Sequence, residues 1–113
     1  EQAPFETRAV LEEAIDLVAD AVRRKGLQCG LVLEPDVPEW LAGDAGRIRQ
    51  VIVNLLGNAV KFTRAGSVHL HVSGHTRGEA CRLRIEVTDT GIGIAPEAQR
   101  RLFRPFVQAD AST

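Results

Sequence analysis

Apolar residues between positions 45 and 63 recur with the spacing of one face of an α-helix. At about 100° per residue, six of them share one broad face: Ile48, Val51, Ile52, Leu55, Leu56 and Ala59. Five polar residues fall on a separate stripe: Arg47, Gln50, Asn54, Asn58 and Lys61. Asp44 is a suitable N-cap, so the pattern predicts an amphipathic helix that runs to about Phe62.

The polar stripe carries amides where a plain surface helix would carry Glu and Lys. Asn54, Asn58 and Lys61 follow one another at i, i+4 and i+7, so they point the same way. Asn competes for backbone hydrogen bonds inside a helix, and such local conflicts tend to occur at functional sites. An amide oxygen is a hard ligand for Mg²⁺, and an ammonium group pairs with phosphate. The stripe predicts half of a magnesium–nucleotide site; a solvated polar face is the alternative that the helix alone leaves open.

The remaining segments predict a second helix and several strands. Residues 8–24 repeat apolar side chains with helical spacing. Apolar and polar residues alternate at 27–34, 67–73 and 81–88, and the last two segments predict an antiparallel hairpin with one packed and one wet face. With residues 1–7 as a short edge strand, this order predicts an α/β (α+β) two-layer sandwich. Both helices would cover the apolar face of a mixed, largely antiparallel sheet.

Composition narrows the class of protein. The chain has 113 residues, of which 44% are hydrophobic and 26% charged, and this suits one soluble domain with one core. A net charge of −1 provides no basic field for nucleic acid, and no apolar run approaches the ~20 residues that span a bilayer. Cys29 and Cys81 have strand-like surroundings and no CxxC spacing, so we expect small buried residues in a reducing compartment. A disulfide or metal role is the less favoured alternative.

A second motif follows the predicted hairpin. Asp89 stands at the end of the strand, and Gly91 and Gly93 come directly after it. Glycines permit close approach of a ligand to the backbone, and an ionised Asp accepts hydrogen bonds from an exocyclic amine such as that of adenine. The spacing matches neither the GxGxxG motif of dinucleotide folds nor a phosphate-binding GK[ST] loop. An ordinary turn after a strand explains one Asp and one Gly, but it explains both glycines less well.

The last segment departs from the earlier patterns. Pro96 suits the first position of a short helix that runs to about Leu102. Residues 103–108 (FRPFVQ) then break the pattern, and they could form a lid hinge or a small packing anchor. On these residues alone the packing anchor is the preferred interpretation.

Three histidines lie in or beside the predicted hairpin. His69 and His71 share the wet face of a strand, and His75 lies in the turn. We expect solvated side chains there, and a metal site formed by all three is the alternative.

Together these motifs resemble those of the ATP-binding catalytic domain of hybrid sensor histidine kinases, within the wider family of gyrase B, Hsp90 and MutL. Residues 54–63 (NLLGNAVKFT) resemble its asparagine box, residues 89–93 (DTGIG) its first glycine box, and residues 103–110 (FRPFVQAD) its phenylalanine box. The likeness covers nearly the whole chain. It implies a Bergerat-type sandwich of a mixed sheet and three helices. It also implies a single domain over residues 1–113 that stops before the family's second glycine box.

The resemblance implies roles for four residues of the central helix. Asn58 would coordinate Mg²⁺, and Asn54 would support the same corner of the site. Lys61 would contact the phosphates of ATP, and Phe62 would pack near the adenine. Asn54, Asn58 and Lys61 would thus be the catalytic residues.

The glycine box would complete the cofactor site. Asp89 would hydrogen-bond the adenine amine, while Gly91 and Gly93 would give the ligand backbone room. The cofactors implied are therefore ATP and Mg²⁺.

The resemblance also implies a reaction. Related ATPases carry a Glu at the position of Asn54, where it activates water, and an amide cannot take that proton. The chain would present the γ-phosphate for transfer to a His on a separate dimerisation domain rather than hydrolyse it, and phosphoryl transfer needs positioning and charge neutralisation above all. Because the acceptor His and the second glycine box are missing, this piece alone is expected to be inactive and to bind nucleotide weakly.

Partners and location follow from the same resemblance. They would be the His-containing domain of the same protein and a receiver domain or response regulator, without nucleic acid or direct membrane contact. The location would be cytoplasmic, in a parent protein that could be anchored in the inner membrane. The alternative is a non-catalytic or serine-directed, anti-sigma-like member of the same superfamily.

Overall fold

The computed structural model describes residues 3–89 and 103–111, the latter by their backbone alone. Within these residues, two helices and six strands follow one another along the chain. Their order is β1 (Ala3–Glu6), α1 (Thr7–Arg24), β2 (Gln28–Leu33), β3 (Trp40–Gly43), α2 (Ala45–Phe62), β4 (Ser67–Arg77), β5 (Ala80–Asp89) and β6 (Phe103–Ala111). The two predicted helices are confirmed almost to the residue. The short helix predicted from Pro96 lies outside the described residues.

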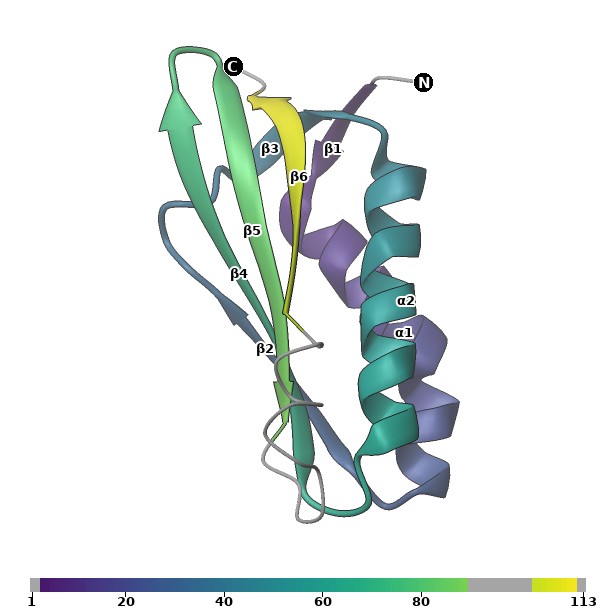
Figure 1. Cartoon of the computed structure of the whole chain (residues 1–113). Coiled ribbons are helices and arrows are strands. Elements are labelled where there is room, and N and C mark those ends of the chain that lie inside the picture. The colour runs from purple at the N-terminus through teal and green to yellow at the C-terminus, as the bar shows by residue number, and fades with distance from the viewer. Residues whose placement is uncertain (1–2, 90–102, 112–113) are drawn as a thin grey trace.

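The strands form one sheet in the order β1-β3-β6-β5-β4-β2. Only β2 and β4 pair in parallel among the described strands, and the other neighbours are antiparallel. The two helices lie side by side on one face of this sheet, as Figure 1 shows. The predicted two-layer sandwich with a mixed, largely antiparallel sheet is therefore confirmed.

The core lies between the sheet and the two helices. β4 and β5 turn alternate side chains inward, and residues such as Val68, Leu70 and Ile85 are fully buried there. From α2, five residues enter this core: Ile48, Ile52, Leu56, Ala59 and Val60. Val51 and Leu55, which were predicted on the core face, are only half-buried, and Val60 takes a core position instead. The core-facing stripe of α2 is thus rotated toward Val60 relative to the predicted face.

Residues 103–108 form part of a strand, which their sequence did not predict. Their expected role as a lid hinge or a packing anchor depends on side chains outside those that the structure describes. β6 lies between β3 and β5 and pairs antiparallel with both. Without it, β3 and β5 would face each other with unpaired backbone N–H and C=O groups, which are costly to leave unsatisfied. The pairing is irregular between Arg84 and Glu86, opposite the stretch of β6 that contains Pro105. Proline has no N–H to donate to a ladder, so an irregularity at that point is expected.

Both cysteines pack into the sheet. Cys81 is buried in β5, and Cys29 is half-buried in β2. Burial raises the pKa of the Cys29 thiol. The prediction that these residues act as small apolar packing units is confirmed for their burial.

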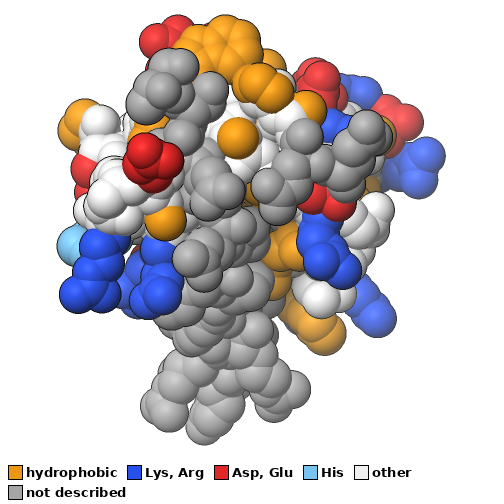
Figure 2. Space-filling view, turned by 90° about the horizontal axis from the view of Figure 1, so that it is seen from above, with side chains coloured by type: hydrophobic (Ala, Val, Ile, Leu, Met, Phe, Trp, Pro, Cys, Tyr) orange, Lys and Arg blue, Asp and Glu red, His pale blue; other side chains and the backbone are white. Residues whose placement is uncertain are grey.

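The described surface carries charges of both signs. Figure 2, which looks onto the end where α2 begins, shows acidic and basic side chains interspersed with apolar ones. Neither α1 nor α2 combines the length and the hydropathy that a membrane-crossing helix needs.

Asp44 begins α2 as predicted. Its Oδ1 accepts a hydrogen bond from the backbone N–H of Arg47 at 3.1 Å, and this contact satisfies one of the unpaired donors of the first turn. The same bond holds the pKa of the Asp44 carboxyl below its usual range. The ionised cap therefore stabilises the fold at pH values above the usual pKa of Asp. This contribution is lost as the pH falls through the lowered pKa of Asp44.

Replacing Asp44 by Ala should lower the melting temperature by a few degrees at pH 7, because the first turn of α2 loses its cap. The deficit should shrink toward about pH 3, where protonation weakens the wild-type cap as well. Thermal unfolding followed by circular dichroism measures both effects. Asp16→Ala, an exposed carboxylate in the middle of α1, is the control. A deficit that stays constant between these pH values would contradict this role of Asp44.

Candidate functional site

The polar stripe of α2 faces away from the core. Ile52 and Leu56 are fully buried, and Asn54 and Asn58 lie on the opposite side of the helix, where both are exposed. Lys61 is exposed on the same side, in the last turn of the helix. The structure thus brings the three residues predicted as catalytic onto one accessible face.

Within the stripe, two of the three amides bond to each other. Gln50 donates from Nε2 to Oδ1 of Asn54 at 3.0 Å, across one turn of the helix. In the described part of the chain, Asn58 has no side-chain hydrogen bond, so its amide is available to a ligand. The sequence placed Gln50 on the stripe without a role. Its i, i+4 spacing to Asn54 was the signal that could have revealed this contact.

The two flanks of the stripe differ. On one flank Arg49 forms an ion pair with Glu13 of α1 at 2.9 Å, so this flank faces the neighbouring helix. The other flank is apolar, with Leu55 half-buried and Phe62 52% exposed. The Lys61 ammonium lies 5.7 Å from the centre of the Phe62 ring, within the range of a cation–π contact. The end of α2 therefore offers a cation and an aromatic surface side by side.

Asp89 lies at the same end of the domain as the last turn of α2. It pairs with Val68 at the start of β4, and β4 begins only five residues after α2 ends at Phe62. Figure 1 shows the ends of α2 and β5 at the same pole of the molecule. Asp89 is half-buried, and its Oδ2 is shielded from solvent. A carboxylate and the C-terminal end of the α2 stripe thus share one pole.

Two predicted site residues, Gly91 and Gly93, lie outside the described residues. The structure therefore tests the predicted site only for its helix half and Asp89.

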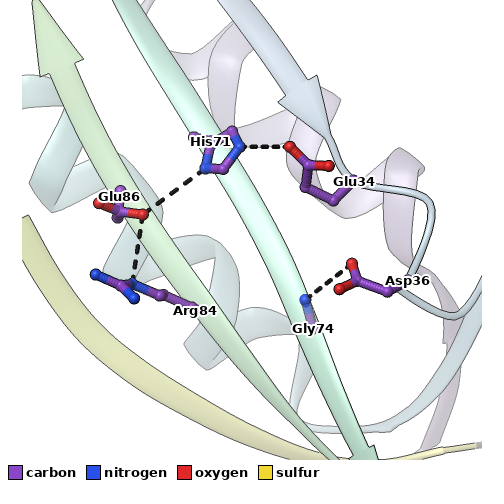
Figure 3. A network of polar contacts seen from close by, with 6 residues as sticks. All are labelled: Glu34, Asp36, His71, Gly74, Arg84 and Glu86. Atoms are coloured by element: carbon purple, nitrogen blue, oxygen red, sulfur yellow. Dashed lines mark hydrogen bonds and ion pairs between the residues drawn. The ribbon is translucent and has the colours of Figure 1, made fainter.

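The histidines lie on the face of the sheet opposite the helices. His71 contacts Glu34 at 2.7 Å and Glu86 at 3.7 Å, and Glu86 in turn contacts Arg84 at 3.3 Å (Figure 3). His71 is therefore half-buried in a polar network, and the prediction of a simply solvated side chain is wrong for it. The hairpin register, which sets Glu86 opposite His71, is the reason.

The other two histidines differ from His71. His69 bonds to Ser67 at 2.9 Å. His75 is exposed as expected, but it lies in β4, which continues to Arg77, and the prediction that it lies in the turn is wrong. In the described part of the chain, no three His, Cys, Asp or Glu side chains converge as metal ligands would. His69 and His71 are thus held by separate contacts, and the described residues do not gather the three histidines into one metal site.

A family model described as "Histidine kinase-, DNA gyrase B-, and HSP90-like ATPase" matches residues 43–113. This range contains α2, the hairpin and the glycine motif. It covers more than half of the chain, so the resemblance based on three motifs is confirmed at the level of the family.

Curated relatives agree. The signal transduction histidine-protein kinase BarA of Escherichia coli K12 is 41% identical over 113 residues, which are 99% of this chain and 12% of BarA. The peroxide stress-activated histidine kinase mak2 of Schizosaccharomyces pombe is 40% identical over 96% of this chain and 5% of its own length. The chain thus spans only a small part of these relatives.

Solved structures agree as well. The full-length ShkA structure in complex with AMPPNP has a TM-score of 0.69 and 36% identity, over 89% of this chain and 21% of ShkA. The Acinetobacter baumannii histidine kinase AdeS gives a TM-score of 0.61 and 28% identity, over 86% of this chain and 46% of AdeS. With the family match, these likenesses show that the chain belongs to the histidine kinase-, DNA gyrase B- and HSP90-like ATPases, with sensor histidine kinases among its relatives.

Proposed function

We propose that the chain is the ATP-binding catalytic module of a sensor histidine kinase, and that it presents the γ-phosphate of ATP to a His on a separate dimerisation domain. One observation carries the proposal. The exposed polar stripe of α2 ends with Lys61 at the same pole as the carboxylate that ends β5. A nucleotide has opposite chemical needs at its two ends, and this pole offers a cation for one and an acceptor for the other.

Three residues of α2 bind the phosphates and Mg²⁺, and a fourth packs against the adenine. Lys61 contacts the phosphates, and its ammonium neutralises part of their charge. Asn58 supplies a neutral amide oxygen to Mg²⁺, and Asn54, held by Gln50, supports the same corner. Phe62, more than half exposed, provides an apolar surface against which the adenine packs.

The donor chemistry of the stripe fits Mg²⁺ that arrives with the nucleotide. The five residues of the stripe include no carboxylate, so most of the negative charge around the ion must come from the phosphates. Mg²⁺ bound there would neutralise the developing charge on the transferred phosphoryl group. The chain itself then contributes position rather than covalent chemistry.

Asp89 and the glycine motif after it bind the adenine base of the nucleotide. Asp89 accepts a hydrogen bond from the exocyclic amine of adenine, and Gly91 and Gly93 leave room for the ligand beside the backbone. A half-buried carboxylate suits this task, because a shielded hydrogen bond to a charged acceptor is stronger than one in open water.

The proposal extends to the larger protein. Residues 1–113 form a single domain of a longer kinase, whose partners are the dimerisation domain and a receiver domain or response regulator. The name of one Dictyostelium discoideum relative, "Hybrid signal transduction protein dokA", 40% identical over 99% of this chain, supports a hybrid arrangement. We propose a cytoplasmic location for this domain, and we propose that the chain alone is inactive toward a His.

Replacing Asp89 by Asn should weaken ATP binding about 10- to 100-fold, because the amine of adenine loses a charged acceptor. The affinity for GTP should fall only a little, because guanine lacks that amine at the same ring position. Isothermal titration of both nucleotides measures the two affinities, with Asp16→Asn as the control for loss of a carboxylate. An ATP affinity unchanged in Asp89→Asn would contradict the assignment, and so would equal losses for ATP and GTP.

Replacing Asn54 by Glu should raise ATP hydrolysis about tenfold or more, because a carboxylate at this position can take a proton from the attacking water. The rate of phosphate release, measured in a protein with the complete catalytic domain, tests this. Gln28→Glu, at an exposed position of β2, adds the same charge elsewhere. If the two variants hydrolyse ATP equally, the idea that Asn54 keeps the site from hydrolysing ATP is refuted.

A further inference from the structure

Lys25 connects the ends of the two helices. It follows the last residue of α1, and its Nζ donates to the backbone oxygens of Val60 and Lys61, at 2.7 Å and 3.1 Å. These oxygens belong to the last turn of α2, which lies 35 residues further along the chain. Gly26 follows Lys25 and has a φ of +70°, a left-handed conformation that is common just after the end of a helix.

The last turn of α2 needs this contact. A helix leaves its final four carbonyl groups without amide partners, and α2 stops at Phe62. Thr63 donates two hydrogen bonds to the backbone oxygen of Ala59, one from its backbone N–H and one from its hydroxyl. The Lys25 ammonium donates hydrogen bonds to the next two backbone oxygens, those of Val60 and Lys61. Its positive charge also interacts favourably with the negative end of the helix dipole.

This turn carries two residues of the proposed nucleotide site. Lys61, whose carbonyl Lys25 binds, extends its own ammonium toward the solvent, and Phe62 follows it. If the turn frays, both side chains lose their position relative to Asn58, which lies one turn earlier. We infer that Lys25 is a positioning residue for nucleotide binding, which acts through the last turn of α2 without touching the ligand. This inference rests on the proposed function.

The chain offers a matched control. Arg24 is the neighbouring basic residue at the end of α1, it is exposed, and no described contact joins it to α2. Lys25→Met and Arg24→Met remove the same charge one residue apart, but only the first removes the bonds to α2. Lys25→Arg keeps a donor on a long side chain and is the rescue variant.

ATP and adenosine affinities of the four proteins test the inference. Lys25→Met should bind both ligands about five- to tenfold more weakly, Arg24→Met should change either by less than about twofold, and Lys25→Arg should recover most of the loss. Adenosine is the decisive ligand, because it carries no phosphate. A Lys25 that acted on the phosphates directly would weaken ATP and leave adenosine unchanged, and that result would overturn the positioning role.

Amide hydrogen exchange without nucleotide provides the second readout. Lys25→Met should speed exchange at residues 60–63 and leave the middle of α2 as in the wild type. Exchange that stays the same at this turn would overturn the inference, as would equal affinities in Lys25→Met and Arg24→Met. If Lys25→Met does not fold, Lys25→Gln, whose shorter side chain cannot span the same distance, takes its place. If the wild-type protein binds no ATP, the proposed function is refuted instead. The exchange data would still show whether Lys25 stabilises the last turn of α2.

Discussion

The burial of one face of α2 determines where every other part of the candidate site can lie. Ile52, Leu56 and Ala59 are fully buried, so the helix cannot rotate about its axis without exposing apolar surface. Burying a side chain of the size of Ile or Leu is worth about 1.5–3 kcal/mol, and several act together here. The direction of the polar stripe is therefore fixed by residues that never meet a ligand. Its function depends on the core behind it.

The second constraint is the register of the β4–β5 hairpin. Because Asp89 pairs with Val68, the end of β5 returns to the point where the chain has just left α2. A one-residue slip would turn Val87 and its buried neighbours to the wet face, so the same apolar alternation that builds the core also sets the position of the carboxylate. Helix and hairpin thus bring Lys61, Phe62 and Asp89 to one pole by packing alone.

Local patterns predicted much of this and failed where distant segments meet. The helical and alternating periods predicted α1, α2 and the hairpin, and the N-cap at Asp44, because these depend on neighbours in sequence. The pairing of residues 103–111 between β3 and β5 could not be read locally, since it satisfies backbone groups of two distant strands. The contact of His71 with Glu34 and that of Lys25 with Val60 escaped for the same reason. The site residues themselves were predicted from motifs, and their roles rest on the family.

The central claim is that the α2 stripe and Asp89 bind one nucleotide together. Chemical-shift mapping during a titration with Mg²⁺ and AMPPNP tests it most directly, because it reports on every backbone amide at once. The account predicts that the largest changes cluster at residues 54–62 and around Asp89. It also predicts that the outer sheet face near Glu34 and His71 stays unchanged. Changes confined to only one of the two elements, or centred on the outer face, would contradict a shared site.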